Sequence, residues 1–258
     1  MSSAMTDADL AAHLAETAGR LLLEVRASGL FSAKALGKAG DQTANQFLVH
    51  ALREQRAEDG LLSEEMACDG ARLQHSRVWI VDPVDGTREY GEARADWAVH
   101  VGLAIDGVPT IGAVALPGHD DGIVLRTDQP RAIPPAPEKL RMVVSRTRPA
   151  PQAVAVAEAL GAELVPMGSA GAKAMAVILG QADIYLHAGG QYEWDSCAPA
   201  AVALAHGLHA SRIDGSPLIY NQEDTYMPDL LICRKEQAAR ALGMIAAVSG
   251  KNQAFQEI

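Results

Sequence analysis

The spacing of apolar residues changes along the chain, and each spacing predicts a different kind of element. Apolar side chains recur at helical spacing over Thr6–Ser28, and Gly29 is a natural stop, so a first helix is predicted there. A second helix is predicted over Asp41–Glu58. The segment between them, Ser32–Gly40, is rich in small residues and has no clear period, which predicts a mobile loop.

Runs typical of strands follow. Val78–Val81 is apolar without alternation, as expected of a strand covered on both faces. Trp97–Ile105 and Val108–Leu116 are joined by Asp106-Gly107, a strong hairpin signal, so an antiparallel meander is predicted.

A Pro-rich stretch, Asp128–Pro137, separates this region from one of different character and is interpreted as a lobe boundary. The prediction is an N-terminal metal-binding lobe over 1–130 and a C-terminal substrate-selecting lobe over 138–258, in one compact unit. The second lobe alternates strands with helices, which indicates an α/β arrangement. Its predicted strands are Leu140–Ser145, a strand near Leu164, Asp183–His187 and Leu230–Cys233, and its helices are Pro151–Leu160, Ala170–Leu179, Ser196–His206 and Gln237–Val248.

Composition narrows the class of protein. Of the 258 residues, 48% are hydrophobic and 21% charged, which is typical of a globular protein. No apolar run approaches the roughly 20 residues of a membrane span, and the opening residues lack signal-peptide features, so a cytoplasmic protein is expected. The net charge of -10 argues against binding a nucleic acid polymer. The cysteines Cys68, Cys197 and Cys233 are expected to be buried thiols.

The buried run Val78–Val81 leads directly into Asp82-Pro83-Val84-Asp85-Gly86-Thr87. Pro83 and Gly86 force a turn there, so two carboxylates are fixed on one short loop. Carboxylates this close repel each other unless a cation lies between them, and oxygen ligands suit Mg2+. A magnesium site is the natural interpretation.

Two further acidic clusters occur, Ser63-Glu64-Glu65 and Glu193-Trp194-Asp195-Ser196. Taken alone, the glutamates read as a solvated pair and Asp195 as a helix N-cap. Together with the Asp82 turn, in this order, the three motifs resemble the inositol monophosphatase superfamily of magnesium-dependent, lithium-sensitive phosphatases. Within it the chain is most similar to the CysQ branch, and particularly to its actinobacterial members.

This resemblance implies a layered αβαβα sugar-phosphatase fold and hydrolysis of the 3'-phosphate of 3'-phosphoadenosine 5'-phosphate, a step of sulfur metabolism. Inositol 1-phosphate and fructose 1,6-bisphosphate remain alternative substrates, and a non-catalytic phosphometabolite sensor is a more distant alternative. The resemblance also implies inhibition by lithium and a homodimer.

Site residues are carried over from the matching motifs. The resemblance implies that two or three Mg2+ ions are held by Glu64, Asp82, the carbonyl of Val84, Asp85 and Asp195. Glu64 with Thr87 is the candidate for activating the attacking water, and the amides of Gly86 and Thr87 are placed to cradle phosphate oxygens. Asp41 either caps the second helix or joins the site as the preceding loop closes. In the loop-closing segment the family usually has an alanine before this aspartate, where this chain has Gly40, which is expected to loosen the loop.

Substrate selection is expected from the second lobe. Gly168-Ser169-Ala170-Gly171-Ala172-Lys173 is a turn of small residues at a helix start, with a lysine in the first turns. It is not a Walker A loop, because no Gly-Lys-Ser/Thr follows at the required spacing. By resemblance, a small phosphorylated metabolite is contacted by Gly168, Ser169, Lys173, Ser145 and Arg146, in addition to Asp85, Gly86, Thr87 and Asp195; ordinary turn chemistry is the alternative for the second-lobe residues.

Overall fold

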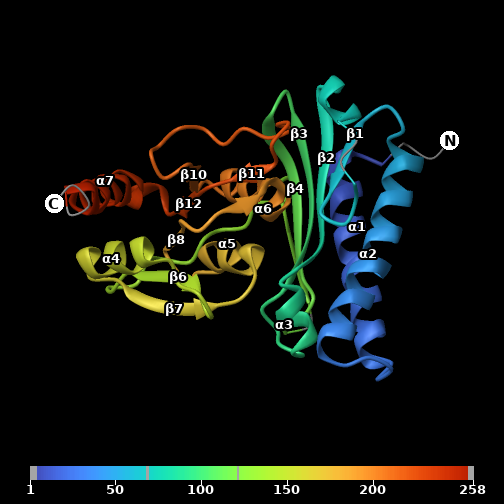
Figure 1. The fold of residues 1–258 in the computed structure, drawn as a ribbon, viewed down its shortest axis with the longest axis horizontal. Coiled ribbons are helices and arrows are strands. Elements are labelled where there is room, and N and C mark those ends of the chain that lie inside the picture. The colour runs from blue at the N-terminus through green and yellow to red at the C-terminus, as the bar shows by residue number, and fades with distance from the viewer. Residues whose placement is uncertain (1–4, 68–69, 121, 255–258) are drawn as a thin grey trace.

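The computed structural model describes residues 5–67, 70–120 and 122–254, without the side chains of residues 251–254. Its elements stack in alternating layers of helices and sheets, as Figure 1 shows from the helix pair near the N-terminus to the helix pair near the C-terminus. The layered α/β fold expected from the sequence is confirmed.

The first sheet has the strand order β1-β2-β3-β4-β5, with β1 parallel to β2 and every other pair antiparallel. The predicted hairpin is confirmed, and its turn residues Asp106 and Gly107 both have positive φ, at 51° and 77°. The strands are β1 (Gly60–Ser63), β2 (Arg77–Asp85), β3 (Ala98–Ile105), β4 (Val108–Leu116) and β5 (Ile123–Arg126).

The second sheet has the order β10-β12-β8-β6-β7, in which β6 is parallel to both β7 and β8. Parallel neighbours bring the carboxyl ends of β6, β7 and β8 to one edge of the sheet. The strands are β6 (Arg141–Ser145), β7 (Glu163–Met167), β8 (Ile184–His187), β10 (His209–Ser211) and β12 (Leu230–Cys233), and a separate two-stranded sheet pairs β9 (Gln191–Tyr192) with β11 (Tyr226–Met227).

Seven α-helices fill the other layers within the described residues. Helices α1 (Asp7–Ala27) and α2 (Ala33–Gln55) cover the outer face of the first sheet, and the short α3 (Thr87–Gly91) follows β2. Helices α5 (Ala170–Ile178) and α6 (Glu193–Ala205) lie between the two sheets, and α4 (Pro151–Leu160) and α7 (Ala238–Ala254) cover the far face. Two 3-10 turns, Ala71–Gln74 and Lys235–Gln237, complete the elements.

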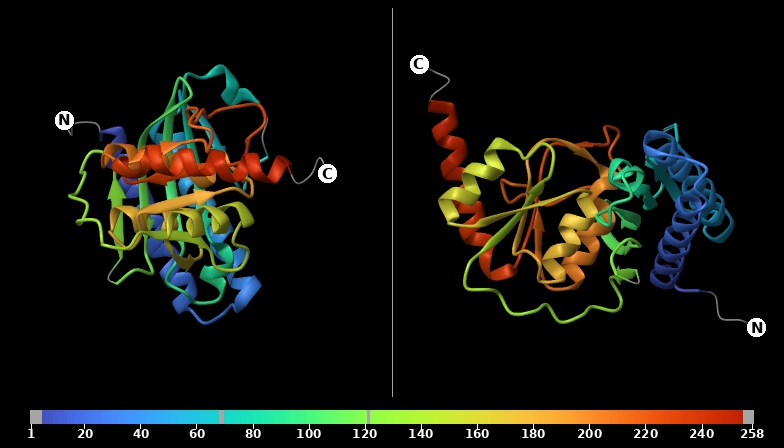
Figure 2. Two further views of the ribbon diagram at one scale, coloured as in Figure 1. Left: turned by 90° about the vertical axis from the view of Figure 1, so that its left-hand side faces the viewer. Right: turned by 90° about the horizontal axis from the view of Figure 1, so that it is seen from below.

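The Pro-rich segment 128–137 has no helix or strand and connects β5 of the first sheet to β6 of the second. Figure 2 shows it running along the outside of the molecule. The core nevertheless continues across the two halves, because α5 and α6 pack with residues of both sheets in one buried cluster that includes Ile80, Val114, Met175 and Ile232.

The expected loop at Ser32–Gly40 is wrong. Helix α2 begins at Ala33, and Asp41 therefore lies inside the helix and does not cap it. Gly37 and Gly40 lower helix propensity, but both sit where the helix is packed closely: a Cβ at Gly37 would lie 2.7 Å from Cγ2 of Thr87, and one at Gly40 would lie 2.6 Å from Cε1 of Tyr90. The glycines serve packing, not mobility.

Two further expectations concern composition. Cys197 and Cys233 are free and buried, as expected, and Cys68 lies outside the described residues. In the part of the chain that the structure describes, no helix combines the length and the apolar character that crossing a membrane requires.

Candidate active site

The candidate site forms where the end of β2 meets the start of α5 and α6. Strand β2 is buried along almost its whole length, so the turn after it is fixed in position. Helix α5 follows β7, and α6 begins shortly after β8, so both helix starts lie at the edge where the parallel strands of the second sheet end. Candidate residues next to the first sheet and next to the second sheet thus face one another.

Three aspartates, Asp82, Asp85 and Asp195, bring carboxylate oxygens within 4.8 Å of one another there. Burial, and after it the neighbouring charges of Glu64 and Asp85, raises the pKa of Asp82 well above its usual value. Burial and the charge of Asp85 likewise raise the pKa of Asp195 to about 6. This cluster holds more negative charge than its surroundings neutralise.

Glu64 joins the cluster through Asp82. It follows β1, which pairs with β2 in parallel, and its carboxyl group is hydrogen-bonded to that of Asp82. Glu64 reaches solvent, yet the desolvation that remains and the charge of Asp195 raise its pKa to about 7. Two bonded carboxyl groups must share a proton, and a bound cation can take that proton's place.

Asp85 differs from its neighbours because donors of the second lobe surround it. Its Oδ1 accepts from the amide of Ala170 at 3.0 Å, and its Oδ2 accepts from the amide of Gly171 at 2.5 Å and from the hydroxyl of Ser169. Burial alone would raise its pKa, but the nearby His100 and these hydrogen bonds hold the pKa of Asp85 well below its usual range. Asp85 therefore joins the first lobe to the N-terminus of α5.

His100 is buried on β3 between two acceptors. Its Nδ1 lies 3.0 Å from the carbonyl oxygen of Trp194. Its Nε2 lies 3.1 Å from Oδ2 of Asp85, which is an ion-pair distance, although the angle is not that of a straight hydrogen bond. Burial opposes the charge, but the Asp85 carboxylate prevails and raises the pKa of His100. A ring with an acceptor at each nitrogen is best satisfied as an imidazolium.

The turn at Ser169 is built for this close approach. Ser169 has a φ of +47°, an unusual conformation that is stabilised by its hydroxyl, which donates to Asp85 and accepts from the amide of Ala172 at 3.0 Å. Gly171 has no room for a side chain, because a Cβ there would lie 2.0 Å from Nε2 of His100. The predicted turn at the helix start is confirmed, with its amides directed at Asp85.

Thr87 begins α3 directly after the Asp85-Gly86 turn. Its Oγ1 lies 3.3 Å from Oδ1 of Asp41 and 3.1 Å from the carbonyl oxygen of Val84. The sequence suggested Glu64 as the partner of Thr87, but within the described residues the hydroxyl is paired with Asp41 and Val84. Burial, and then the charge of Glu65, raises the pKa of Asp41 to about 7.

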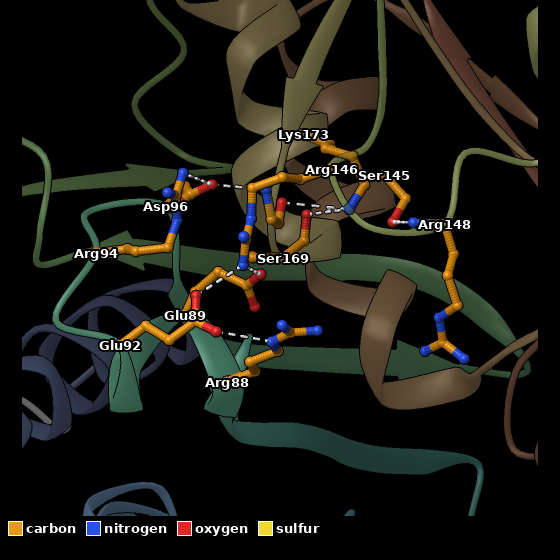
Figure 3. A network of polar contacts seen from close by, with 11 residues as sticks. Arg88, Glu89, Glu92, Arg94, Asp96, Ser145, Arg146, Arg148, Ser169 and Lys173 are labelled. Carbon is orange, nitrogen blue, oxygen red and sulfur yellow. Dashed lines mark hydrogen bonds and ion pairs between the residues drawn. The ribbon is translucent and has the colours of Figure 1, made fainter. Parts of the chain in front are cut away.

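The second-lobe residues expected to touch substrate are occupied by contacts within the protein. The Lys173 ammonium is buried and donates to the carbonyl oxygens of Ser169 and Gly168, at 2.5 and 3.2 Å. The hydroxyl of Ser145 accepts from the amide of Arg148, and the guanidinium of Arg146 pairs with two glutamates on or just after α3 (Figure 3).

Sequence reasoning missed His100, Glu89 and Asp96. His100 sits in an apolar strand, where a lone histidine gives no signal of its partner. Glu89 and Asp96 follow the Asp85 segment without any local motif, yet Glu89 is buried and Asp96 accepts from the amide of Gly168 at 2.6 Å. Their partners lie more than 50 residues away in sequence, which no local pattern encodes.

The donor set fits a hard divalent cation. Asp82, Asp85, Asp195 and Glu64 offer carboxylate oxygens, Val84 offers a carbonyl oxygen, and no cysteine or second histidine competes within the described cluster. The pKa values of Asp82 and Asp195 are raised by burial and also because neighbouring carboxylates repel one another, and a bound divalent cation would neutralise that charge.

A layered α/β fold with an acidic cluster between its lobes defines a class of metal-binding phosphatase-like proteins, and the comparisons with known proteins give the family. Residues 8–251 match the profile described as the inositol monophosphatase family, so the chain belongs to that family.

Curated relatives support this membership, and solved structures show the same fold. A "3'-phosphoadenosine 5'-phosphate phosphatase" of Mycobacterium leprae is 51% identical over 95% of each chain, and one of Mycobacterium bovis is 53% identical over 89% of each. Among solved structures, an inositol monophosphatase from Anabaena has a TM-score of 0.74 at 21% identity and covers 93% of this chain and 95% of its own. CysQ from Bacteroides thetaiotaomicron has a TM-score of 0.72 at 25% identity, over 86% of this chain and 94% of its own.

Proposed function

We propose that this chain is a Mg2+-dependent phosphomonoesterase that removes the 3'-phosphate of 3'-phosphoadenosine 5'-phosphate, leaving AMP and phosphate. The observation that carries the proposal is the cluster of Asp82, Asp85 and Asp195, whose carboxylate oxygens lie within 4.8 Å of one another between the lobes. The relatives named for this activity extend over nearly the whole chain, at 51% and 53% identity.

Asp82, Asp85 and Asp195, with Glu64 and the Val84 carbonyl, are the residues that would hold Mg2+. The chemistry supplied by the bound ions is a lowered pKa of a coordinated water and neutralisation of charge on the phosphate. The protein's own part is to hold these carboxylates in position. The buried strand β2 fixes Asp82, and the hydrogen bonds from α5 fix Asp85.

Asp41 and Thr87 are the pair that would handle the proton of the attacking water. When the Thr87 hydroxyl donates to Asp41, its oxygen lone pairs are free to accept a hydrogen bond from the water. Asp41 at a pKa of about 7 is matched to a general base that works near neutral pH. The amide groups at the start of α3, beside Thr87, would orient the phosphate oxygens.

The substrate is best tested by direct comparison. Phosphate release should be measured with 3'-phosphoadenosine 5'-phosphate, inositol 1-phosphate and fructose 1,6-bisphosphate at equal concentrations, each with Mg2+ and with a chelator. We expect the nucleotide to be preferred and the chelator to abolish turnover. Preference for either sugar phosphate would overturn the substrate assignment, and binding of the nucleotide without any turnover would favour a sensor.

Asp82→Asn is the sharpest variant for the metal assignment. Asp85 also holds the second lobe, so its replacement confuses metal loss with loss of lobe contacts, whereas the direct hydrogen bonds of Asp82 are to the Val84 amide and to Glu64. We expect Asp82→Asn to lower Mg2+-dependent turnover by at least about 100-fold, with the unfolding temperature of the metal-free protein retained. Unchanged turnover would refute the metal assignment.

A further inference from the structure

A set of ion pairs crosses between the lobes beside the acidic cluster (Figure 3). The guanidinium of Arg146, which follows β6, donates from Nη2 to Oε1 of Glu89 at 2.8 Å and to Oε2 of Glu92 at 2.9 Å. Glu89 lies in α3, two residues after Thr87, and its side chain is only 10% exposed. A carboxylate this enclosed requires a partner, and Arg146 supplies it.

Glu89 also touches both glycine turns of the site. A Cβ built on Gly168 would lie 2.3 Å from Cγ of Glu89, so the Gly168 backbone rests directly on this side chain. A Cβ on Gly86 would lie 3.5 Å from Oε2 of Glu89. Glu89 thus fills the space between the turn that follows the metal-binding strand and the turn that begins α5.

Arg146 is tied to the same turn from the other side. Its amide donates to the carbonyl oxygen of Met167 at 3.1 Å, which joins the end of β6 to the residue before Gly168. Asp96 completes the arrangement by accepting from the Gly168 amide at 2.6 Å, while the guanidinium of Arg94 holds it in a fork at 2.7 and 3.0 Å. The donors to Asp85 come one to three residues later, from Ser169, Ala170 and Gly171.

We infer that Glu89 and Arg146 form a positioning pair that sets the register of the 168–171 turn against Asp85, and through it the metal and substrate affinity of the site. Nothing in this arrangement requires Arg146 to touch substrate, because its guanidinium donates to two glutamates. The inference rests on the proposed function only for the choice of substrates, since its first measurements are made on the free protein.

Glu89→Gln is the informative variant. Glutamine keeps the size of the side chain and its packing under Gly168, but it removes the charge that pairs with Arg146. Arg146→Met removes the same pair from the other side. Glu92→Gln is the matched control, because Glu92 accepts from the same guanidinium but is 38% exposed and also accepts from Arg88 of the preceding helix α3.

The first readout is amide hydrogen exchange in the 168–171 turn, measured without metal or substrate. We expect Glu89→Gln and Arg146→Met to speed exchange of these amides by about tenfold, with amides of distant core strands unchanged, and the double variant to add little to either single one. Glu92→Gln should stay within about twofold of the unmodified protein. A uniform increase along the chain would indicate general destabilisation and would overturn the inference.

The second readout is Mg2+ binding by calorimetry, followed by kinetics. We expect both variants to weaken Mg2+ binding by about tenfold, since partners that orient a ligand have effects of this size. KM should then rise by the same factor for the nucleotide bisphosphate and for a simple aryl phosphate. If Arg146→Met raises KM only for the bisphosphate while Glu89→Gln behaves as the unmodified protein, Arg146 is a direct phosphate ligand and the inference fails. Failure of the nucleotide as substrate, with exchange and Mg2+ binding altered as expected, would count against the proposed function alone.

Discussion

The hydroxyl oxygen of Thr87 lies 3.3 Å from Oδ1 of Asp41, although 46 positions separate the two residues in sequence. Thr87 begins α3, just after the strand that carries Asp82 and Asp85, and Asp41 belongs to a helix on the outer face of the first sheet. This contact brings a carboxyl group of raised pKa to the edge of the acidic cluster. Through this hydrogen bond, helix α2 contributes Asp41 to the candidate site.

Replacement of Asp41 by Asn should therefore lower kcat with little change in KM for substrate. Asn cannot take up a proton, so the contribution of a general base, about 100-fold to 10,000-fold, would be lost. Steady-state kinetics at saturating Mg2+ measures the effect, and Thr87→Val should resemble it. Thr43→Val is the control, because the hydroxyl of Thr43 is on the same helix, is exposed and bonds only the Ala39 carbonyl oxygen. A kcat for Asp41→Asn within twofold of the control would exclude this role.

Gly40 offers a test of the packing of α2. Alanine favours a helix by about 1 kcal/mol over glycine, but a Cβ at position 40 would lie 2.6 Å from the Tyr90 ring. Tyr90 is held by a hydrogen bond of 2.7 Å from its hydroxyl to the Leu22 carbonyl oxygen, so the ring has little freedom to move away. We expect Gly40→Ala to lower the free energy of unfolding by about 1 to 3 kcal/mol.

The matched control is Gly243→Ala in α7, where a Cβ meets nothing within 4 Å. The free energy of unfolding of this variant should rise by up to about 1 kcal/mol, from helix propensity alone. Urea unfolding of both variants decides the matter. Stabilisation by Gly40→Ala comparable to that by Gly243→Ala would show that the contact with Tyr90 is relaxed in solution.

The sequence predicted those features that depend on neighbours along the chain. The buried strand Val78–Val81 and the Asp106-Gly107 hairpin were predicted because their signals follow one another directly along the chain. The turn expected at Pro83 is wrong: β2 continues to Asp85 with a register shift between Asp82 and Asp85, and the chain turns only at Gly86. The start of α2 was not predicted either, because its glycines indicate a loop when the helix is considered alone. In the folded protein Gly37 and Gly40 leave room for Thr87 and Tyr90, which lie about 50 positions further along the chain.

The side-chain contacts within the site could not be predicted from the sequence either. Asp85 is an obvious candidate ligand from sequence, but the donors that surround it come from residues 169–171, more than 80 positions away. Thr87 could be matched with any nearby carboxylate until the path of α2 was known. Side-chain pairing across a lobe interface is a property of the folded backbone, and a single sequence does not encode it in any local pattern.

Asp7 provides a test of stability away from the site. It accepts from Arg56 at 2.7 Å and from Arg77 at 2.8 Å, joining α1 to the end of α2 and to β2. Partial burial opposes the shift, but these arginines lower the pKa of Asp7. A lowered carboxyl pKa stabilises the fold above the unfolded value, near pH 4, and that stabilisation is lost as the pH falls through the folded value.

Asp7→Asn should therefore lower the free energy of unfolding by up to about 1 kcal/mol at pH 7 and by much less at pH 3. Urea titrations at the two pH values measure this difference. The control is Glu16→Gln in the same helix, whose contact with Arg20 at 3.7 Å is open to solvent and should contribute nothing measurable. A cost for Asp7→Asn that is the same at both pH values would mean that its charge is not what matters.

The acidic cluster predicts that pH and Mg2+ act together on stability. The folded-state pKa values of Asp195 and Glu64, about 6 and about 7, lie above the ordinary values of these groups. The folded protein then binds more protons than the unfolded chain between about pH 4 and pH 7, so without metal its unfolding free energy falls as pH rises through that window. The raised pKa of His100 acts in the same direction, since its stabilising charge is lost as pH rises through the folded value.

Mg2+ should reverse this loss, because it binds the ionised carboxylates and competes with the protons. At a free Mg2+ concentration of about 100 times the dissociation constant, binding raises the free energy of unfolding by about 2.7 kcal/mol. This corresponds to a rise of roughly 5 to 10 °C in unfolding temperature. We expect scanning calorimetry with Mg2+ and with a chelator to show that Mg2+ raises the unfolding temperature clearly more at pH 8 than at pH 5. Asp82→Asn should lose most of the increase at pH 8. An increase of equal size at both pH values would mean that Mg2+ stabilises the protein from somewhere other than this cluster.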